Sequence, residues 1–247
     1  MKSYVVKEVF PTLQGEGARA GTKAVFVRFS GCNLWDGHPE HRDRGAGACA
    51  SWCDSSFADG ERVAQDVLLR RMLVAWQKDK PAAGERWCVL TGGEPMLQVD
   101  RGLVSALRDE GWLVAVETNG SVDAEALELM RWVTVSPKRG APWRVKRGSE
   151  LKVVLPGAAQ HHDPGWTDED LVGMAEGSAF EHYFVQPQDP VDRGLVQVSH
   201  LAGNLREDLR DSGHLAYRLH LERCVDFVAS HPRWRLSTQL HKHVGLP

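Results

Sequence analysis

Short apolar runs in this 247-residue chain alternate with helix-like segments, and this alternation constrains the fold more than any other feature of the sequence. Such runs, each separated from the next by a helix or a long loop, are typical of a mostly parallel sheet covered by helices. Runs of this kind predict strands at 5–10, 24–31, 86–93, 113–120, 132–138, 150–156, 182–187 and 234–239. The helix-like pattern predicts helices at 61–76, 98–110, 122–130 and 215–228.

Polar or glycine-bearing motifs stand where most of these strands end. They read SGC, TGGEP, ETNG, SPK and QP in chain order. Because the carboxyl ends of parallel strands meet at one edge of a sheet or barrel, these motifs predict a single shared site. We therefore expect one α/β domain over 1–247 with a mostly parallel sheet covered by helices. Two segments rich in Asp, Glu, His and Gly, 157–180 and 190–213, are expected to be surface insertions.

Charge and hydropathy exclude several partners. The chain carries 33 acidic and 30 basic residues, a formal charge of −3, so no broad positive field favours nucleic acid. No apolar run approaches the roughly 20 residues needed to cross a bilayer, and the first residues lack the order of a signal peptide. The sequence thus predicts a cytoplasmic protein with neither nucleic acid nor a membrane as partner.

Three of the five cysteines, Cys32, Cys49 and Cys53, are clustered, which in a reducing compartment favours metal or redox chemistry over disulfides. They are one ligand short of a closed structural zinc site, and His38 or His41 would complete one. Alternatively, three thiolates hold an iron–sulfur cluster whose remaining iron is open to a small molecule. A third interpretation is three unrelated thiols. Spacing alone does not choose among the three.

The surrounding motifs resemble a known family. The cysteines, Trp52 and the later GGEP, ETNG and SPK motifs are similar in order and placement to the radical S-adenosylmethionine superfamily. Within it, the chain resembles the 7-carboxy-7-deazaguanine synthase family. That resemblance is carried by LQGEG (13–17), VRFSGCNLW (27–35), CDSSF (53–57), TGGEPMLQ (91–98), ETNGS (117–121), VSPK (135–138), ELKVVLP (150–156), VQP (185–187) and QLHKHVGLP (239–247).

The resemblance implies a partial radical-S-adenosylmethionine β/α barrel and a carbon–nitrogen lyase. Its reaction would be the ring contraction of 6-carboxy-5,6,7,8-tetrahydropterin to 7-carboxy-7-deazaguanine, with loss of ammonia, in the biosynthesis of 7-deazapurines such as queuosine. The implied cofactors are a 4Fe–4S cluster, S-adenosylmethionine and Mg²⁺. The family further implies a flavodoxin- or ferredoxin-like electron donor, and a homodimer is expected because a truncated barrel leaves an edge exposed.

The resemblance also assigns roles to residues, with no catalytic side chain beyond the cluster and the adenosyl radical. Cys32, Cys49 and Cys53 match the cluster ligands, and Ser55 matches the Mg²⁺ ligand. Positions around S-adenosylmethionine are matched by Trp52, Gly92, Gly93, Glu94, Ser136, Lys138 and Gln186. Substrate contacts are matched by Gln14, Gly15, Glu16, Arg28, Thr91, Asn119, His241 and Pro247.

The cysteine spacing departs from the common radical-S-adenosylmethionine pattern. Most such enzymes space their ligands C-x3-C-x2-C, whereas this chain has C-x16-C-x3-C. Loop insertions cost little free energy, so the three sulfur atoms need only converge in space. Two other hypotheses stay open at the level of sequence: a different radical enzyme of the activase type, and a non-enzymatic zinc-binding module.

Overall fold

The computed structural model describes residues 2–78, 84–155, 165–189 and 203–246, and the side chains of 203–216 are outside this description. Its strands form one nine-stranded sheet in the order β3-β1-β2-β4-β5-β6-β7-β8-β9. The strands are β1 Ser3–Leu13, β2 Lys23–Phe29, β3 Glu61–Ala64, β4 Arg86–Gly92, β5 Trp112–Thr118, β6 Trp132–Val135, β7 Arg147–Leu155, β8 Ala179–Pro187 and β9 Trp234–Leu236. The α-helices are α1 Gln65–Gln77, α2 Arg101–Asp109, α3 Asp168–Glu176, α4 Gly203–Ser230 and α5 Leu240–His243.

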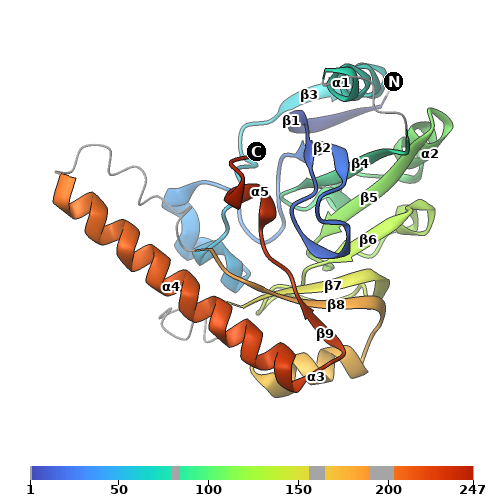
Figure 1. Cartoon of the computed structure of the whole chain (residues 1–247). Helices are drawn as coiled ribbons and strands as arrows, with labels where there is room; N and C mark the ends of the chain where they lie inside the picture. The colour runs from blue at the N-terminus through green and yellow to red at the C-terminus, as the bar shows by residue number, and fades with distance from the viewer. Residues whose placement is uncertain (1, 79–83, 156–164, 190–202, 247) are drawn as a thin grey trace.

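The sheet is mostly parallel and does not close into a complete barrel. Every pairing from β2 through β9 is parallel, and β1 pairs antiparallel with both β2 and β3. The sheet curves around a central space that α5 enters, while α1, α2, α3 and α4 lie along its outer side (Figure 1). The expected α/β class with a partial barrel of mostly parallel strands is confirmed.

Side chains of the parallel strands alternate between two different surroundings. Toward the helices, one set forms the main core, which includes Val27, Leu90, Val116, Leu151 and Val185. The residues that alternate with these along each strand face the inside of the curved sheet. Near the amino ends of the strands this inner face is apolar, with Ala24, Phe26, Trp87, Val89 and Ala115. Near the carboxyl ends it becomes polar, with Arg28, Thr91, Glu117, Lys152 and Gln186.

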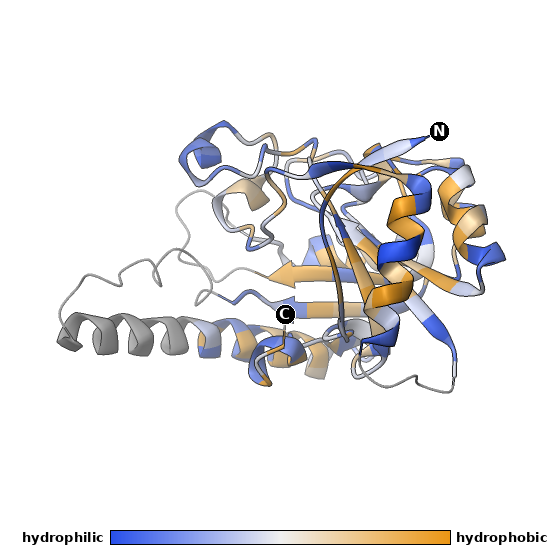
Figure 2. Cartoon of the chain, turned by 90° about the horizontal axis from the view of Figure 1, so that it is seen from above, coloured by the Kyte–Doolittle hydropathy of each residue, from blue (hydrophilic) through white to orange (hydrophobic). Residues whose placement is uncertain are grey.

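The helices cover the outer face through amphipathic stripes. In α2 the predicted stripe Leu103, Val104 and Leu107 is fully buried, and Asp100 caps the helix by accepting from the Leu103 N–H at 2.9 Å. The helices carry mixed hydrophobic and hydrophilic residues, whereas the parallel strands are mainly hydrophobic (Figure 2). Among the described residues no helix has both the length and the apolar composition needed to span a membrane.

The structure corrects several expected boundaries. Residues 61–64 are not helical but form β3, because Ser3 to Val6 of β1 offers an unpaired edge to which they bind. The expected helix at 122–130 is a 3₁₀ helix over Glu125–Leu129. Helix α4 begins at Gly203, well before the predicted start at 215, and its Phe227 is buried in the main core.

The prediction of a surface insertion at 157–180 is partly wrong. Within 157–180 the described residues contain α3, whose Leu171, Met174 and Ala175 pack into the main core. Its start is marked by a capping box in which Thr167 accepts from the Asp170 N–H at 3.1 Å. This portion is therefore an element of the barrel wall. Residues 157–164 and 190–202 lie outside the described residues, and 203–213 belong to α4.

Candidate active site

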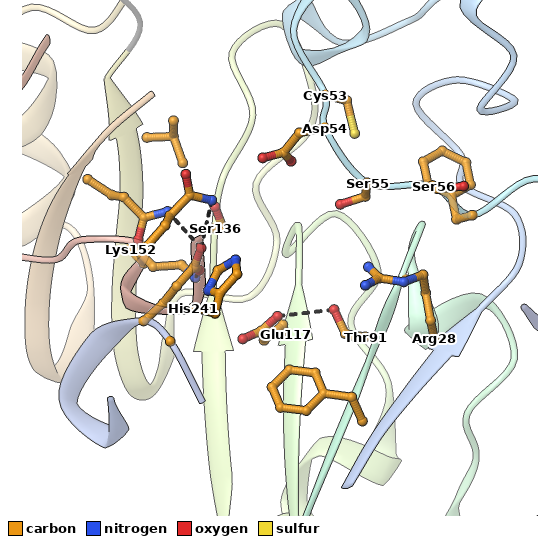
Figure 3. A pocket seen from close by; sticks show the side chains of 18 of the residues that line it. Arg28, Cys53, Asp54, Ser55, Ser56, Thr91, Glu117, Ser136, Lys152 and His241 are labelled. Carbon is orange, nitrogen blue, oxygen red and sulfur yellow. Dashed lines mark hydrogen bonds and ion pairs between the residues drawn. The ribbon is translucent and has the colours of Figure 1, made fainter. Parts of the chain in front are cut away.

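The strand-end motifs surround a pocket of about 910 Å³ at the carboxyl ends of the parallel strands. Of the site residues predicted from the sequence, all that lie among the described residues line this pocket, except Glu94. Pro247 lies outside the described residues. Figure 3 shows the arrangement: Cys53 and Ser55 come from the loop above, and Arg28, Thr91 and Glu117 from the strands below.

The three clustered cysteines reach the pocket from one loop. Cys32 follows β2, and Cys49 and Cys53 bracket a short turn; all three are free thiols and line the pocket. Burial raises the pKa of Cys32 and raises that of Cys49 to about 12, although Lys138 opposes the shift at Cys49. Buried thiols of this kind bind as thiolates only when a positive centre compensates for their charge.

The three thiols are a donor set that suits a 4Fe–4S cluster. Within the described part of the chain, no group of three or more His, Cys, Asp and Glu side chains is placed to hold one metal ion. His41, a candidate zinc ligand, is instead paired with Asp36 at 2.5 Å. In a 4Fe–4S cluster each thiolate binds a different iron, so the sulfur atoms converge on a larger volume. The residues present therefore fit a three-cysteine cluster.

Lys138, Ser136 and Trp52 form one corner of the pocket beside the cysteines. The Lys138 Nζ donates to Ser136 Oγ at 2.7 Å and lies 5.5 Å from the centre of the Trp52 ring. Both polar residues follow β6, whose end is fixed by the Ser136 N–H donating to the Thr118 carbonyl at 2.8 Å. The result is a cation and an aromatic face within reach of one ligand.

Gly92 and Gly93 are required by the close approach of β2 and the cysteine loop. A Cβ on Gly92, whose φ is +132°, would lie 2.1 Å from the Phe29 carbonyl oxygen. A Cβ on Gly93 would lie 2.1 Å from the Gly31 oxygen and 2.9 Å from Cys32 Cβ. The sequence motif thus brings the chain together directly under Cys32.

Glu94 is fully buried and does not line the pocket. Its carboxylate accepts from the Met96 N–H at 2.9 Å, from Thr118 Oγ1 at 2.8 Å and from the Asn119 N–H at 2.7 Å. Burial raises the pKa of Glu94. This side chain joins the ends of β4 and β5 and so holds Asn119 in place, while its contact with S-adenosylmethionine stays a prediction.

Glu16 lies at the opposite end of the pocket in a buried polar network. One carboxylate oxygen accepts from Lys152 Nζ, and the other accepts from Gln186 Nε2 and Gln239 Nε2, each at 3.0 Å. Burial alone raises the pKa of Glu16, but the Lys152 ammonium outweighs it and holds that pKa below its usual range. The attraction of Glu16 likewise raises the pKa of Lys152 despite its burial. Both groups are therefore charged at neutral pH.

A second carboxylate, Glu117, stands on β5 in the middle of the pocket. It accepts from Gln14 Nε2 at 2.9 Å through one oxygen and from Thr91 Oγ1 at 3.0 Å through the other. A carboxylate has about four acceptor positions, so each oxygen keeps one for a ligand. A dashed line in Figure 3 joins Thr91 and Glu117.

Arg28 lines the pocket on the other side of Thr91. Its Nε donates to Glu8 Oε1 at 2.6 Å, and its guanidinium lies 5.6 Å from the Phe10 ring centre. Arg28 and Thr91 are direct register partners in β2 and β4. Because Glu8 occupies only the Nε, the two terminal nitrogens remain for an anionic ligand.

The carboxyl-terminal segment closes one side of the pocket. Gly15 is buried beneath His241, and the Leu240 N–H donates to the Gly15 carbonyl at 2.9 Å. On the far side, Lys242 Nζ pairs with Asp54 at 2.8 Å and with Asp189 at 3.6 Å. The segment therefore connects the loop after β1 to the cysteine loop.

We expect Gly15→Ala to displace this segment. Its Cβ would lie 2.0 Å from His241 Nδ1 and 2.8 Å from the His241 backbone nitrogen, so backbone must move. A displacement of about 1 Å in a substrate pocket lowers kcat/KM by about 10²-fold. Steady-state kinetics measure this loss. Gly173→Ala, on an open helix position with nothing within 4 Å, is the matched control and should retain full activity.

Several pocket residues escaped the sequence analysis. No role was predicted for Lys152, Glu117, Glu8 and Gln239, although all of these except Glu8 lie inside the motifs that carry the resemblance. Strand periodicity carries the signal for Lys152, Glu117 and Glu8, because each occupies an inward position two residues from another inward residue, as Glu150 and Lys152 do on β7. Gln239 follows β9 and has no such signal.

The fold and the site together define a class. In the solved structures, the crystal structure of QueE from Escherichia coli is similar over 97% of this chain and 95% of that chain, with a TM-score of 0.61 and 21% identity. No model of a protein family matches the sequence. The class that the fold and the site define is an open, mostly parallel barrel with three cysteines at its carboxyl-end pocket.

Curated relatives identify the family within that class. The 7-carboxy-7-deazaguanine synthase of Bordetella pertussis is 39% identical, over 99% of this chain and 100% of its own length. That of Burkholderia multivorans is 40% identical, with the same coverage. The chain belongs to the 7-carboxy-7-deazaguanine synthase family. Membership decides against the activase and zinc-module hypotheses, and it implies S-adenosylmethionine and a 4Fe–4S cluster as cofactors.

Proposed function

We propose that this enzyme contracts the ring of 6-carboxy-5,6,7,8-tetrahydropterin to give 7-carboxy-7-deazaguanine and ammonia, in a 7-deazapurine pathway of the queuosine type. One observation supports this most strongly. The polar inner layer of the barrel and the three-cysteine loop meet in a single pocket, so a bound pterin and a bound cofactor would face each other. When bound, the cluster and S-adenosylmethionine would supply an adenosyl radical that removes a hydrogen atom from the pterin and later returns one.

Cofactor binding falls to the residues near the cysteines. Lys138 and Ser136 offer donors to the carboxylate of S-adenosylmethionine, and Trp52 offers an apolar wall for its adenosine. Gly92 and Gly93 line the pocket next to Cys32, where a bound ligand would meet their backbone. Gln186 is committed to Glu16 and Ser237, at 3.0 and 2.8 Å, so its part is to fix this network in place.

Pterin recognition falls to the carboxylates and to Arg28. The aminopyrimidinone presents N–H donors on one edge, and Glu117, held by Gln14 and Thr91, is the acceptor with free capacity beside them. Arg28 would hold the pterin carboxylate through its two terminal nitrogens. Glu16 and His241 close the same side of the pocket, and Asn119, held by Glu94, borders Cys32.

Four further assignments are part of this proposal. Ser55 would contribute its hydroxyl oxygen to Mg²⁺, a hard cation that prefers oxygen ligands. A flavodoxin- or ferredoxin-like protein would supply the electron. The short outer strands β3 and β9 leave the sheet open at both edges, which supports a homodimer. The enzyme would act in the cytoplasm.

The experiment that tests the proposal compares two pterins, one with and one without the 6-carboxylate. Anaerobic assays would contain the reconstituted enzyme, S-adenosylmethionine, Mg²⁺ and dithionite. We expect wild type to convert only the carboxylated pterin. Arg28→Lys, which keeps the charge but loses the planar pair of donors, should lower kcat/KM by about 10- to 100-fold, as for one charged hydrogen bond.

Equal turnover of both pterins by wild type would contradict the proposal. If Arg28→Lys had an unchanged kcat/KM, Arg28 would not bind the pterin carboxylate, but the proposed reaction would not be contradicted.

A further inference from the structure

The C-x3-C part of the cysteine loop forms a single tight turn. The Cys53 N–H donates to the Cys49 carbonyl at 2.6 Å, and the Trp52 N–H donates to the same oxygen at 3.0 Å. This turn begins within a 3₁₀ helix over Ala48–Ser51 and extends it to Cys53. Residues four apart in a helical turn project to the same side. The extra residue relative to the usual C-x2-C therefore still directs both thiols into the pocket.

A turn of this length leaves carbonyl groups without partners at its end, as a helix terminus does. Here one side chain, Arg42, donates to two such carbonyl groups. The Arg42 Nη1 donates to the Ala50 carbonyl at 2.6 Å, and its Nη2 donates to the Cys53 carbonyl at 2.9 Å. The planar guanidinium presents these two donors in a fixed relation, so it also fixes the distance between Ala50 and Cys53.

Arg42 is itself held by the long first part of the loop. Its guanidinium lies 4.8 Å from the ring centre of Trp35, which is 7% exposed and packs edge-on against Phe57 at 5.6 Å. Gly45 lets the loop come close to the turn, since a Cβ there would lie 2.1 Å from the Ala50 Cβ. Residues between Cys32 and Cys49 thus build a support against the second and third cysteines.

We propose that Arg42 is a positioning residue for the iron–sulfur cluster. It holds the Cys49–Cys53 turn in the conformation that presents both thiols to the pocket, and this support explains how the chain keeps a C-x16-C-x3-C spacing. Its charge, beside the Cys53 carbonyl, would also favour an anionic cluster. The proposal rests on the proposed function in one respect, namely that these cysteines bind the cluster.

The test begins with the cluster-free protein, in which each cysteine is alkylated under native conditions and quantified by peptide mass spectrometry. Cys49 is 4% exposed, so its alkylation reports opening of the loop, whereas fully buried Cys88 in β4 reports unfolding of the barrel. We expect Arg42→Ala to speed the alkylation of Cys49 at least about tenfold and to leave Cys88 unchanged. Arg42→Lys should be intermediate.

Arg44→Ala is the matched control, because Arg44 is exposed at the end of the same 3₁₀ helix, Pro39–Arg44, and should behave as wild type. An unchanged rate at Cys49 in Arg42→Ala would overturn the proposal. So would equal acceleration at Cys49 and Cys88, which would assign Arg42 to general stability.

A second measurement asks whether the effect reaches the bound cluster. After anaerobic reconstitution, the reduction potential of the cluster should fall in Arg42→Ala and be largely retained in Arg42→Lys, which keeps the charge. Identical potentials in all three proteins would contradict the role toward the cluster. A wild-type protein that binds no iron would instead overturn the proposed function, and the alkylation result would stand independently of it.

Discussion

Replacement of Cys49 by alanine is expected to abolish cluster binding and product formation, while the protein remains folded. Cys49 is 4% exposed and lines the pocket with Cys32 and Cys53, so a cluster bound there loses one of three protein ligands. Removal of a single buried sulfur from the loop costs the fold only about 1 kcal/mol. Iron content, the visible absorption of the reconstituted protein and a thermal unfolding curve measure these effects together.

The matched control is Cys88→Ala. Cys88 is fully buried on the helix side of β4, and burial raises its pKa to about 12, so it stays a neutral packed thiol. We expect Cys88→Ala to keep its iron and its activity, at a cost of about 1–2 kcal/mol in stability. Undiminished iron in Cys49→Ala would show that the three-cysteine assignment is wrong.

Lys152→Met is expected to have the largest effect on stability. It leaves the Glu16 carboxylate buried without its cation, and breaking a buried pair in this way lowers the free energy of unfolding by about 3–5 kcal/mol. The side chains are only 6% and 14% exposed, so solvent cannot replace the lost partner. The pterin side of the pocket should lose its shape, because Gln186 and Gln239 depend on the same carboxylate.

The pH dependence of this effect has a definite sign. In the wild type the pKa of Glu16 is held below its ordinary value of 4.5, so the pair contributes stability above that pH and loses it as the pH falls through the folded pKa. The difference in unfolding free energy between wild type and Lys152→Met should therefore be largest near neutral pH and shrink in acid. Denaturant unfolding at several pH values measures it.

A double variant separates the charge from the shape of the site. Glu16→Gln combined with Lys152→Met removes both charges, so it should recover much of the stability lost in the single variant. It should not recover activity, because the network around Gln239 has still changed. A single variant as stable as wild type at neutral pH would show that Glu16 and Lys152 do not form a buried ion pair.

The strands and their polar ends were predictable because each carries its own local signal. The motifs TGGEP and ETNG follow apolar runs, and parallel pairing of β4 with β5 then brings Thr91 and Glu117 within hydrogen-bonding distance. Elements that form only through pairing with a distant strand were not predictable. Residues 61–64 have a helical pattern, yet they pair with the open edge of β1.

The burial of charged side chains was also not predictable from the sequence. Lys152 sits in an apolar strand run, where a lone lysine is usually solvated. Carboxylates from other parts of the chain, Glu16 above all, make its burial stable. Glu94 was assigned to the cofactor from its motif, but its three hydrogen bonds to Met96, Thr118 and Asn119 become visible only when β4 and β5 are side by side. Sequence spacing carries no information about either contact.

The central claim is that one pocket brings a carboxylated pterin to a three-cysteine radical centre. The most direct measurement is anaerobic: wild-type enzyme is reconstituted with iron and sulfide and given dithionite, S-adenosylmethionine, Mg²⁺ and 6-carboxy-5,6,7,8-tetrahydropterin. Mass spectrometry should detect 7-carboxy-7-deazaguanine together with released ammonia, and neither should form with Cys53→Ala. A reconstituted wild type that cleaves S-adenosylmethionine slowly and forms no 7-carboxy-7-deazaguanine would contradict the account.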